Sequence, residues 1–197
     1  MIVHCELDLG MRRIELLRLK VWSFSRGRIN SVQIHGKGRN GGKHRQISWH
    51  PDTAAVLEEY NRMVRQPAIN KARAKNPKCQ IPDELFIYER AGKLEPYKKT
   101  AIDQFLEGLG ERVGFNFTNH DLRRTCGRMM YRSGVRLEQI AKIFGHADTR
   151  TTIKYLGLDF EDMSDAMSQY AQYQKTPIEL KTVQNEESQM ESGQSGI

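Results

Sequence analysis

Residues 30–49 hold two short alternating stretches that flank a glycine-rich, cationic segment, HGKGRNGGKHR at 35–45. Before it, INSVQIHG sets Val32 and Ile34 between polar neighbours, which is the period of a half-buried strand. After it, HRQISWHP reads as a second strand that ends at a proline. We therefore predict an antiparallel β-hairpin with the glycines at its tip, which limits the architecture to one containing a small antiparallel sheet.

The glycine-rich segment does not match the phosphate-binding loop of nucleotide-hydrolysing enzymes. That loop needs a glycine, four further residues, then Gly-Lys and a serine or threonine. Gly42 and Lys43 supply the pair, but Lys37 stands at the first glycine position and His44 follows Lys43. A dinucleotide-binding fingerprint fails as well, because no helical pattern follows the glycines. The cations at this hairpin tip need another explanation.

The rest of the chain is mainly helical. Helical patterns are expected at 10–22, 51–65, 98–113, 119–132, 136–146, 149–156 and 159–170. A short strand and turn are expected at 85–94, and the proline-containing segment 66–83 is predicted to be a long loop. Because strands and helices do not alternate regularly, this order predicts an α+β domain rather than a parallel nucleotide-binding sheet.

The body of the chain is strongly basic. The net charge is +7 with an isoelectric point of about 9.4, and residues 176–197 contribute −3, so residues 1–175 carry +10. Such a charge favours a polyanionic partner, of which nucleic acid is the commonest. No apolar run approaches the roughly 18 residues of a membrane span, so we expect no membrane partner.

The cysteines give no sign of a disulfide framework or a zinc site. Cys5, Cys79 and Cys126 are odd in number, scattered, and form no Cys-x-x-Cys pair. This usage favours a reducing compartment and predicts a cytoplasmic location.

The segment 119–155 carries residues suited to phosphoryl transfer. His120 and Arg123 lie three apart on one predicted helix, and Tyr155 follows His146 by nine residues. A tyrosine attacks well when a base takes its proton and cations hold the electrophile. Arginine neutralises the non-bridging oxygens of a phosphodiester in a bidentate way and keeps its proton. No acidic cluster suited to a two-metal nuclease is present in the sequence, so we expect neither metal nor cofactor.

At this point the chain resembles the tyrosine recombinases, or lambda-type phage integrases, over roughly residues 10–157. GMRRIELLRL is similar to the family's Gly-x-Arg-x-x-Glu-Leu-Leu box, and HDLRRT to its His-x-Leu-Arg-His box. FGHADTRTTIKY resembles the Leu-Gly-His…Thr-Thr-x-x-Tyr box, and LFIYERAGKLEP has the family's spacing between boxes. These boxes mark six positions: Arg12, Glu15, His120, Arg123, His146 and Tyr155.

The resemblance implies a role for each of these residues, with Glu15 as the acidic companion of Arg12. Tyr155 is the nucleophile, and Arg12 and Arg123 stabilise the pentavalent phosphoryl group. His146 adds a hydrogen bond, and His120 is the general base. The implied fold is that of DNA breaking-rejoining enzymes, mainly helical with a small three-stranded antiparallel sheet. The implied working form is a homotetramer on double-stranded DNA, which integrates, excises or inverts DNA through a 3′-phosphotyrosine.

The resemblance also gives the cationic hairpin a function. In the family, a lysine within a Gly-Lys-Gly tip protonates the 5′-hydroxyl leaving group, which points to Lys37. The additional RNGG residues of this tip leave Lys43 as a second candidate. Arg39, Lys43 and Arg45 are expected to contact backbone phosphates. Arg124, which replaces the second histidine of its box, is also assigned to DNA binding.

The chain departs from the family pattern at its ends. We expect the catalytic domain at 1–172 and a disordered tail at 173–197, with no DNA-clamping domain and no first catalytic-domain helix ahead of Arg12. Without that helix, apolar surface is expected around Ile2, Val3 and Leu16. The helix around Phe160 is expected either to pack on its own subunit or to be exchanged between protomers.

Other functions are compatible with parts of the sequence. LEQIAKIFGHADTRTTIKYL is also similar to a helix-turn-helix, so a non-catalytic DNA-binding protein or an inactive recombinase remnant is an alternative. A type IB topoisomerase-like activity would use the same chemistry but rejoin the same strand. A covalent protein–DNA adduct separates catalysis from mere binding.

Overall fold

The computed structural model describes residues 1–36, 44–158, 164, 167, 168 and 170–172. The predicted tail, most of the helix expected at 159–170, and the tip residues Lys37, Arg39 and Lys43 lie outside the described residues. The chain divides into two units, Met1–Gly157 and Leu158–Ile197, and the features below belong to the first. None of the described helices is long and apolar enough to cross a membrane.

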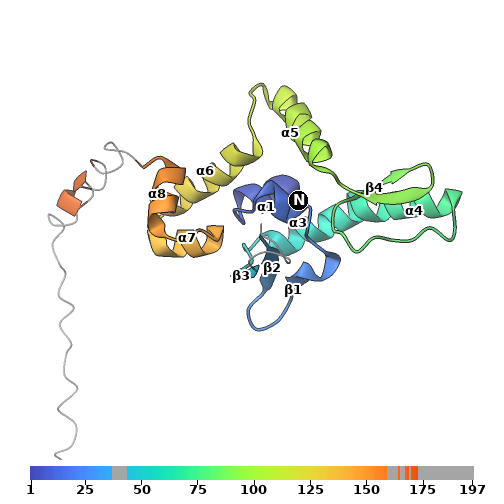
Figure 1. Ribbon diagram of the computed structural model, residues 1–197, viewed down its shortest axis with the longest axis horizontal. Coiled ribbons are helices and arrows are strands. Elements are labelled where there is room, and N and C mark those ends of the chain that lie inside the picture. Colours follow the sequence, from blue (N-terminus) through green and yellow to red (C-terminus); the bar gives the residue numbers. More distant parts are fainter. Residues whose placement is uncertain (37–43, 159–163, 165–166, 169, 173–197) are drawn as a thin grey trace, which may run out of the picture. The chain divides into compact units, whose positions relative to one another are not determined.

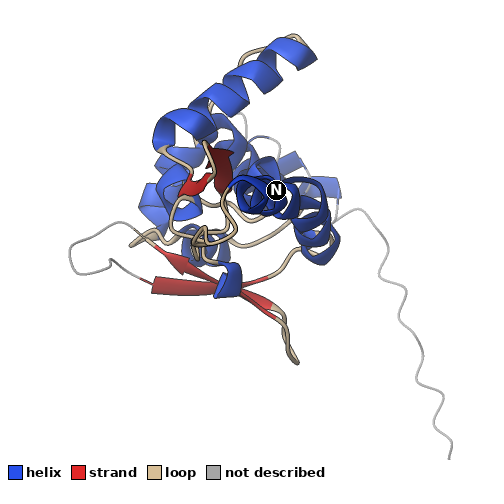
Figure 2. Cartoon of the chain, turned by 90° about the vertical axis from the view of Figure 1, so that its right-hand side faces the viewer, coloured by secondary structure: helices blue, strands red, loops and turns tan. Residues whose placement is uncertain are grey.

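The predicted hairpin is present as part of a three-stranded antiparallel sheet. Strand β1 (Phe24–Ser25) pairs with β2 (Ser31–His35), which pairs with β3 (His44–Ser48), in the order β1-β2-β3. Figure 2 shows these strands in red. In the register, Ile34 lies opposite Arg45 and Val32 opposite Ile47. Val32 and Ile34 are fully buried, so one face of the hairpin covers the core.

The N-terminal segment is more broken than its helical pattern predicted. Helix α1 (Ile2–Leu7) ends before Gly10, whose φ of +60° reverses the chain, and α2 (Arg13–Leu16) is a single turn. A 3-10 turn, η1 (Val21–Ser23), follows. The long helix expected at 10–22 does not form because Lys20 makes a β-bridge with Glu84, and this pairing competes with helical hydrogen bonds.

Helix α1 also removes the apolar surface that was expected at this end. Ile2 and Leu16 are buried, and Val3 is half-buried against the same core. The partner is helix α6 (Asn119–Arg132), against which α1 packs. The expectations of exposed apolar side chains here, and of no helix ahead of Arg12, are therefore wrong.

The predicted loop at 66–83 is helical over its first half. Helix α3 (Thr53–Tyr60) continues through a π-helical turn, η2 (Asn61–Arg65), into α4 (Gln66–Lys75). Pro67 is the second residue of α4, and the wider π-turn directly ahead of it accommodates the ring, so the helix continues past the proline. Burial of Ile69 and Ala72 then holds the extension in place.

The extension packs on a second hairpin. Strands β4 (Ile87–Arg90) and β5 (Lys93–Pro96) pair in an antiparallel manner, and α4 lies along them (Figure 1). Ile87 and Leu94 form a small apolar cluster with the buried face of α4. The sequence indicated only one of these two strands.

The C-terminal half of the unit contains the four helices that the sequence predicted. These are α5 (Lys99–Val113), α6, α7 (Leu137–Phe144) and α8 (Thr149–Leu156), and α6, α7 and α8 pack together (Figure 1). Gly145 and Gly157, both with positive φ, end α7 and α8. Along these helices Leu106 and Arg123 are buried, whereas Phe105 and Met129 are exposed.

Glu6 on α1 is a buried carboxyl that should make stability depend on pH. It is 0 % exposed, and neither carboxyl oxygen has a hydrogen-bond partner within the described part of the chain. Burial raises the pKa of Glu6 to about 8, despite the opposing charge of Arg13. The folded chain therefore keeps a proton that the unfolded chain, with a pKa near the ordinary 4.5, releases.

We predict that Glu6→Gln stabilises the fold increasingly as pH rises. The wild type loses stability relative to the variant from about pH 4.5 up to about pH 8, because there the unfolded state binds fewer protons than the folded state. Thermal unfolding midpoints of both proteins, measured from pH 4 to 9, test this. Curves that stay parallel across the range would show that Glu6 ionises normally.

Candidate active site

A single buried carboxylate organises the cationic side chains of this region. Glu15, at the end of the first turn of α2, is 0 % exposed. It accepts hydrogen bonds from the backbone N–H of Arg12 at 2.7 Å and from Nη1 of Arg12 at 3.1 Å. Arg45 of β3 adds a bidentate pair, with Nη1 at 2.5 Å and Nη2 at 2.9 Å. Nη1 of Arg123 lies 3.9 Å from the same carboxylate.

The charges around Glu15 do not balance. Burial raises the pKa of Glu15, but the hydrogen bonds and charge of Arg45 lower it by more than burial raises it. The pKa therefore lies below its ordinary value, and the group is a carboxylate. One negative charge thus faces the three guanidiniums of Arg12, Arg45 and Arg123. The surplus of positive charge suits the region for an anion.

Arg123 is fixed by acceptors that surround it on α6. It is 2 % exposed, its Nη1 donates to the carbonyl of Gly10, and its Nη2 donates to the carbonyl of Phe144 at 2.7 Å. Its Cζ lies 4.1 Å from the centroid of the Phe144 ring. Burial and the charge of Arg12 lower the pKa of Arg123 to about 9, which leaves it protonated at neutral pH.

The Phe144 ring is the apolar platform of the site. A Cβ atom on Gly127 of α6 would lie 2.9 Å from Cζ of Phe144, and one on Gly10 would lie 2.5 Å from its Cε1. Two glycines therefore allow this ring, at the end of α7, to lie deep between the turn after α1 and helix α6. The rings of His146 and Tyr155 meet it edge-on, with centroids 5.6 Å and 5.9 Å away.

His146 is held neutral by its surroundings. Its Nδ1 lies 2.9 Å from Oγ1 of buried Thr152 on α8, which leaves Nε2 as the other polar atom of the ring. Burial, and then the charges of Arg123 and Arg12, lower the pKa of His146 to about 4. A neutral imidazole beside a cationic site can donate one hydrogen bond to an anion without adding charge.

Tyr155 lies in the last turn of α8 and is half-buried beside these groups. Its ring centroid is 5.5 Å from that of His146 and 6.3 Å from that of His120. Its hydroxyl donates to the carbonyl of His120 at 3.3 Å, and the Cζ of Arg123 lies 5.8 Å from its ring centroid. Burial raises the pKa of Tyr155, which the charge of Arg123 partly offsets.

Two arginines of α6 hold the end of α8. Nε of Arg124 donates to the carbonyl of Tyr155 at 2.8 Å, and Nε of Arg128 donates to the carbonyl of Leu156 at 2.7 Å. These bonds satisfy carbonyls that a helix end leaves free and fix the backbone that carries Tyr155.

The structure brings five of the six predicted catalytic residues together: Arg12, His120, Arg123, His146 and Tyr155. The sixth, Lys37, lies outside the described residues, as do Arg39 and Lys43. His120 is exposed in the first turn of α6.

Two residues expected to contact DNA have other partners in the structure. The guanidinium of Arg45 is bound by Glu15 and by the Ile143 carbonyl, and Arg124 bonds the Tyr155 carbonyl while its residue stays exposed. The sequence also did not single out Thr152, Phe144 or Arg128. The helical spacing of Arg124 and Arg128 indicated one shared face, but nothing showed that α8 lies against it.

A tyrosine beside guanidiniums and a neutral imidazole can accept a phosphoryl group on its hydroxyl oxygen, and the cations stabilise the negative charge that develops on the phosphoryl oxygens. In the described part of the chain, no three His, Cys, Asp or Glu side chains are grouped so that they could hold a metal. Together with the helical α+β fold, these features define the class of phosphoryl-transfer sites that act through tyrosine.

The chain belongs to the phage integrase family, whose model matches residues 2–162. It is 26 % identical over 158 residues to tyrosine recombinase XerA of Pyrococcus horikoshii, covering 80 % of this chain and 50 % of the relative. It is 25 % identical over 163 residues to XerA of Saccharolobus solfataricus, covering 83 % and 47 %. It is 29 % identical over 141 residues to transposase A from transposon Tn554 of Staphylococcus aureus, covering 64 % and 38 %. The chain thus spans about half the length, or less, of these relatives.

Solved structures confirm the predicted fold class. The crystal structure of XerA recombinase matches with a TM-score of 0.63 and 22 % identity, covering 86 % of this chain and 57 % of that one. XerH site-specific recombinase bound to palindromic difH substrate matches with a TM-score of 0.62 and 21 % identity, covering 86 % and 45 %. The α+β fold with its small antiparallel sheet is shared with these proteins.

We predict that His146 titrates well below an ordinary histidine. Because burial and neighbouring arginines disfavour its charged form, its NMR titration midpoint should be about 4. An ordinary midpoint for His146 would show that the cationic surroundings described above are not present in solution.

Proposed function

We propose that this chain is the catalytic part of a site-specific DNA recombinase that acts through a 3′-phosphotyrosine. The observation that carries the proposal is the surplus of guanidiniums around buried Glu15, one of which, that of Arg123, has its Cζ 5.8 Å from the centroid of the Tyr155 ring. A phosphodiester supplies the missing negative charge and the electrophile that a tyrosine attacks. Family membership supports the same function.

In the proposed first step, the Tyr155 oxygen forms a bond to the scissile phosphorus as the bond to the 5′-oxygen breaks. Arg12 and Arg123 neutralise the non-bridging oxygens. They can act together because the carboxylate of Glu15 holds both guanidiniums close to each other. Neutral His146 donates one further hydrogen bond. The proton of Tyr155 goes to His120 as general base, and a lysine of the hairpin tip, Lys37 or Lys43, protonates the 5′-oxygen.

The second step reverses the first with a different strand. The 5′-hydroxyl of a partner strand attacks the phosphotyrosine and gives its proton to the hairpin lysine that was deprotonated in the first step. His120 returns its proton to the tyrosine oxygen as the bond from that oxygen to phosphorus breaks. The phosphotyrosine conserves the energy of the phosphodiester, so the exchange needs neither ATP nor metal. Repetition on the second strand pair would give integration, excision or inversion.

Double-stranded DNA is the proposed partner. The basic body of the chain supports it, as does the relation to XerH, which was solved bound to its difH substrate. We further propose a homotetramer on two DNA sites as the working form. A reducing cytoplasm is the proposed location, consistent with the free cysteines Cys5, Cys79 and Cys126.

The helix-turn-helix alternative is less well supported. Helices α7 and α8 are joined by a short turn, as that motif requires. However, Thr152 and Leu156 of the second helix are buried, and Tyr155 faces His146 and Arg123 rather than open solvent. Helix α8 does keep an exposed face, at Arg150, Thr151, Ile153 and Lys154. The argument against the motif is that it leaves the cluster of Arg12, Arg123 and His146 beside Tyr155 without a role.

We predict that Tyr155→Phe abolishes covalent attachment to DNA and leaves binding intact. Wild-type protein is incubated with labelled duplexes that carry a nick and a randomised sequence around it, and covalent complexes are isolated under denaturing conditions. Sequencing of the trapped DNA gives the target. Tyr131→Phe on α6 is the matched control and should react like wild type. Absence of any adduct with wild type, or adducts with Tyr155→Phe, would contradict the proposed function.

We predict that Lys37→Ala slows cleavage by about 10²- to 10⁴-fold, the usual effect of losing a general acid, and that Lys43→Ala has a much smaller effect. A substrate with sulfur in place of the bridging 5′-oxygen should restore the rate of the Lys37 variant, because a thiolate leaves without protonation. Rates on both substrates, measured for both variants, assign the acid. The reverse order of effects moves the role to Lys43.

A further inference from the structure

Arg45 has a place in the sheet that differs from that of a DNA-facing side chain. It lies opposite Ile34 in the β2–β3 register. It stands two residues before Ile47 on β3, so both side chains project from the same face of the strand. Opposed residues of an antiparallel pair project from the same face of the sheet. Because Ile34 is fully buried, this face is the one that covers the core, and the Arg45 side chain is 12 % exposed.

The guanidinium of Arg45 connects three separate elements. Two of its nitrogens bind the carboxylate of Glu15 on α2, at 2.5 Å and 2.9 Å. Its Nε donates to the carbonyl of Ile143 near the end of α7, at 2.7 Å. Arginine is suited to this because two nitrogens of its planar fork make a bidentate pair while the third donates elsewhere, an arrangement that the single nitrogen of lysine cannot reproduce.

Arg45 also packs against the turn that carries His146. A Cβ atom placed on Gly145 would lie 3.2 Å from Cδ of Arg45 and 3.3 Å from its Nη1. Gly145 has a φ of +62° and directly precedes His146. The side chain therefore touches the backbone that sets the direction of the imidazole.

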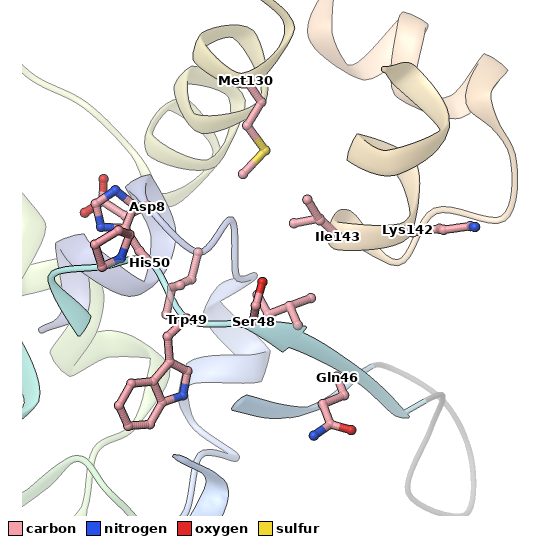
Figure 3. Close-up of a pocket in the computed structure, with 11 residues that line it drawn as sticks. Asp8, Gln46, Ser48, Trp49, His50, Met130, Lys142 and Ile143 are labelled. Atoms are coloured by element: carbon pink, nitrogen blue, oxygen red, sulfur yellow. The ribbon is translucent and has the colours of Figure 1, made fainter. Parts of the chain in front are cut away.

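Apolar packing between β3 and the helices is incomplete beside this contact. A cavity of about 360 Å³ lies there, lined by β3 residues together with Met130 of α6 and Ile143 of α7. Figure 3 shows Met130 and Ile143 pointing into the space above Ser48 of β3. With a cavity on this side, the polar bonds of Arg45 make a direct connection between β3 and the end of α7.

We propose that Arg45 is a positioning residue for the phosphoryl-transfer site rather than a ligand of DNA phosphates. Through Glu15 it orients Arg12 and Arg123, and through the end of α7 it orients His146. It also ties the strand that begins directly after Lys43 to these groups. The expected effect of Arg45 on the reaction rate rests on the proposed function. Its effect on the position of His146 can be tested without DNA.

The catalytic test compares Arg45→Lys, which keeps the charge, with Arg45→Gln, which removes it. Lysine cannot bind Glu15 in a bidentate way and donate to Ile143 together, so both variants should form the covalent adduct on the order of 100-fold more slowly, the cost of a site displaced by about an ångström. DNA affinity should change less than threefold. Arg62→Lys, an exposed arginine paired with Glu59, is the matched control and should keep the wild-type rate.

Two results would overturn the proposal. A wild-type rate for Arg45→Lys would mean that only the charge matters. A large loss of DNA affinity in both variants, with an unchanged rate once DNA is saturating, would make Arg45 a phosphate ligand.

A double-mutant cycle separates positioning from a general loss of stability. Because Arg45 acts partly through Glu15, the rate loss of Arg45→Lys combined with Glu15→Gln should be clearly smaller than the product of the two single losses. Rate losses that multiply would show that the two residues act independently, which contradicts the proposal. Circular dichroism confirms that each variant is folded at the temperature of the assay.

The DNA-free test is the NMR titration of His146. The charged groups that set its pKa are Arg123, Arg12, Arg45 and Asp148. Arg45→Lys conserves their total charge, so a midpoint that rises clearly above that of the wild type shows that the geometry depends on Arg45. An unchanged midpoint overturns the positioning role. If wild type forms no adduct, the proposed function fails, and this titration still decides the role of Arg45.

Discussion

The ionised carboxylate of Glu15 is the interaction on which the site depends. A carboxylate without exposure to water is costly unless charged donors surround it, and here they come from α2, β3 and α6. The cost of burying Glu15 is offset by the same arginines that leave the site with a surplus of positive charge. Folding and anion binding are therefore linked, because removing one of these arginines would both leave buried Glu15 with fewer donors and reduce the positive charge available to an anion.

The sequence predicted the parts of the fold that local chemistry determines. Alternation around Val32 and Ile34 predicted the hairpin, and helical periodicity predicted α5, α6, α7 and α8. Long-range contacts decided the rest. The β-bridge of Lys20 with Glu84 shortened a predicted helix, and burial of Ile69 carried another helix past Pro67. Neither partner could be identified from the local pattern.

The candidate site divides along the same line. Motif spacing predicted a cluster of Arg12, His120, Arg123, His146 and Tyr155, and the structure brings these residues together. The spacing could not show what holds them. The sequence pattern does indicate the direction of the Arg45 side chain, because Arg45 and Ile47 are two residues apart on one face of β3. Its position in a cationic stretch favoured the prediction of a DNA contact instead. Supporting residues such as Thr152 and Phe144 act through contacts between distant segments, which no local motif records.

The attachment of α8 to α6 has a mechanical consequence. In the proposed reaction a DNA strand hangs on the Tyr155 oxygen, and any pull on that strand is transmitted to a helix of only eight residues. The last carbonyls of that helix are held by Arg124 and Arg128, so the force passes sideways into the fourteen-residue α6 rather than unwinding the helix end. The two guanidiniums would thus keep the end of α8 from unwinding when the attached DNA strand moves.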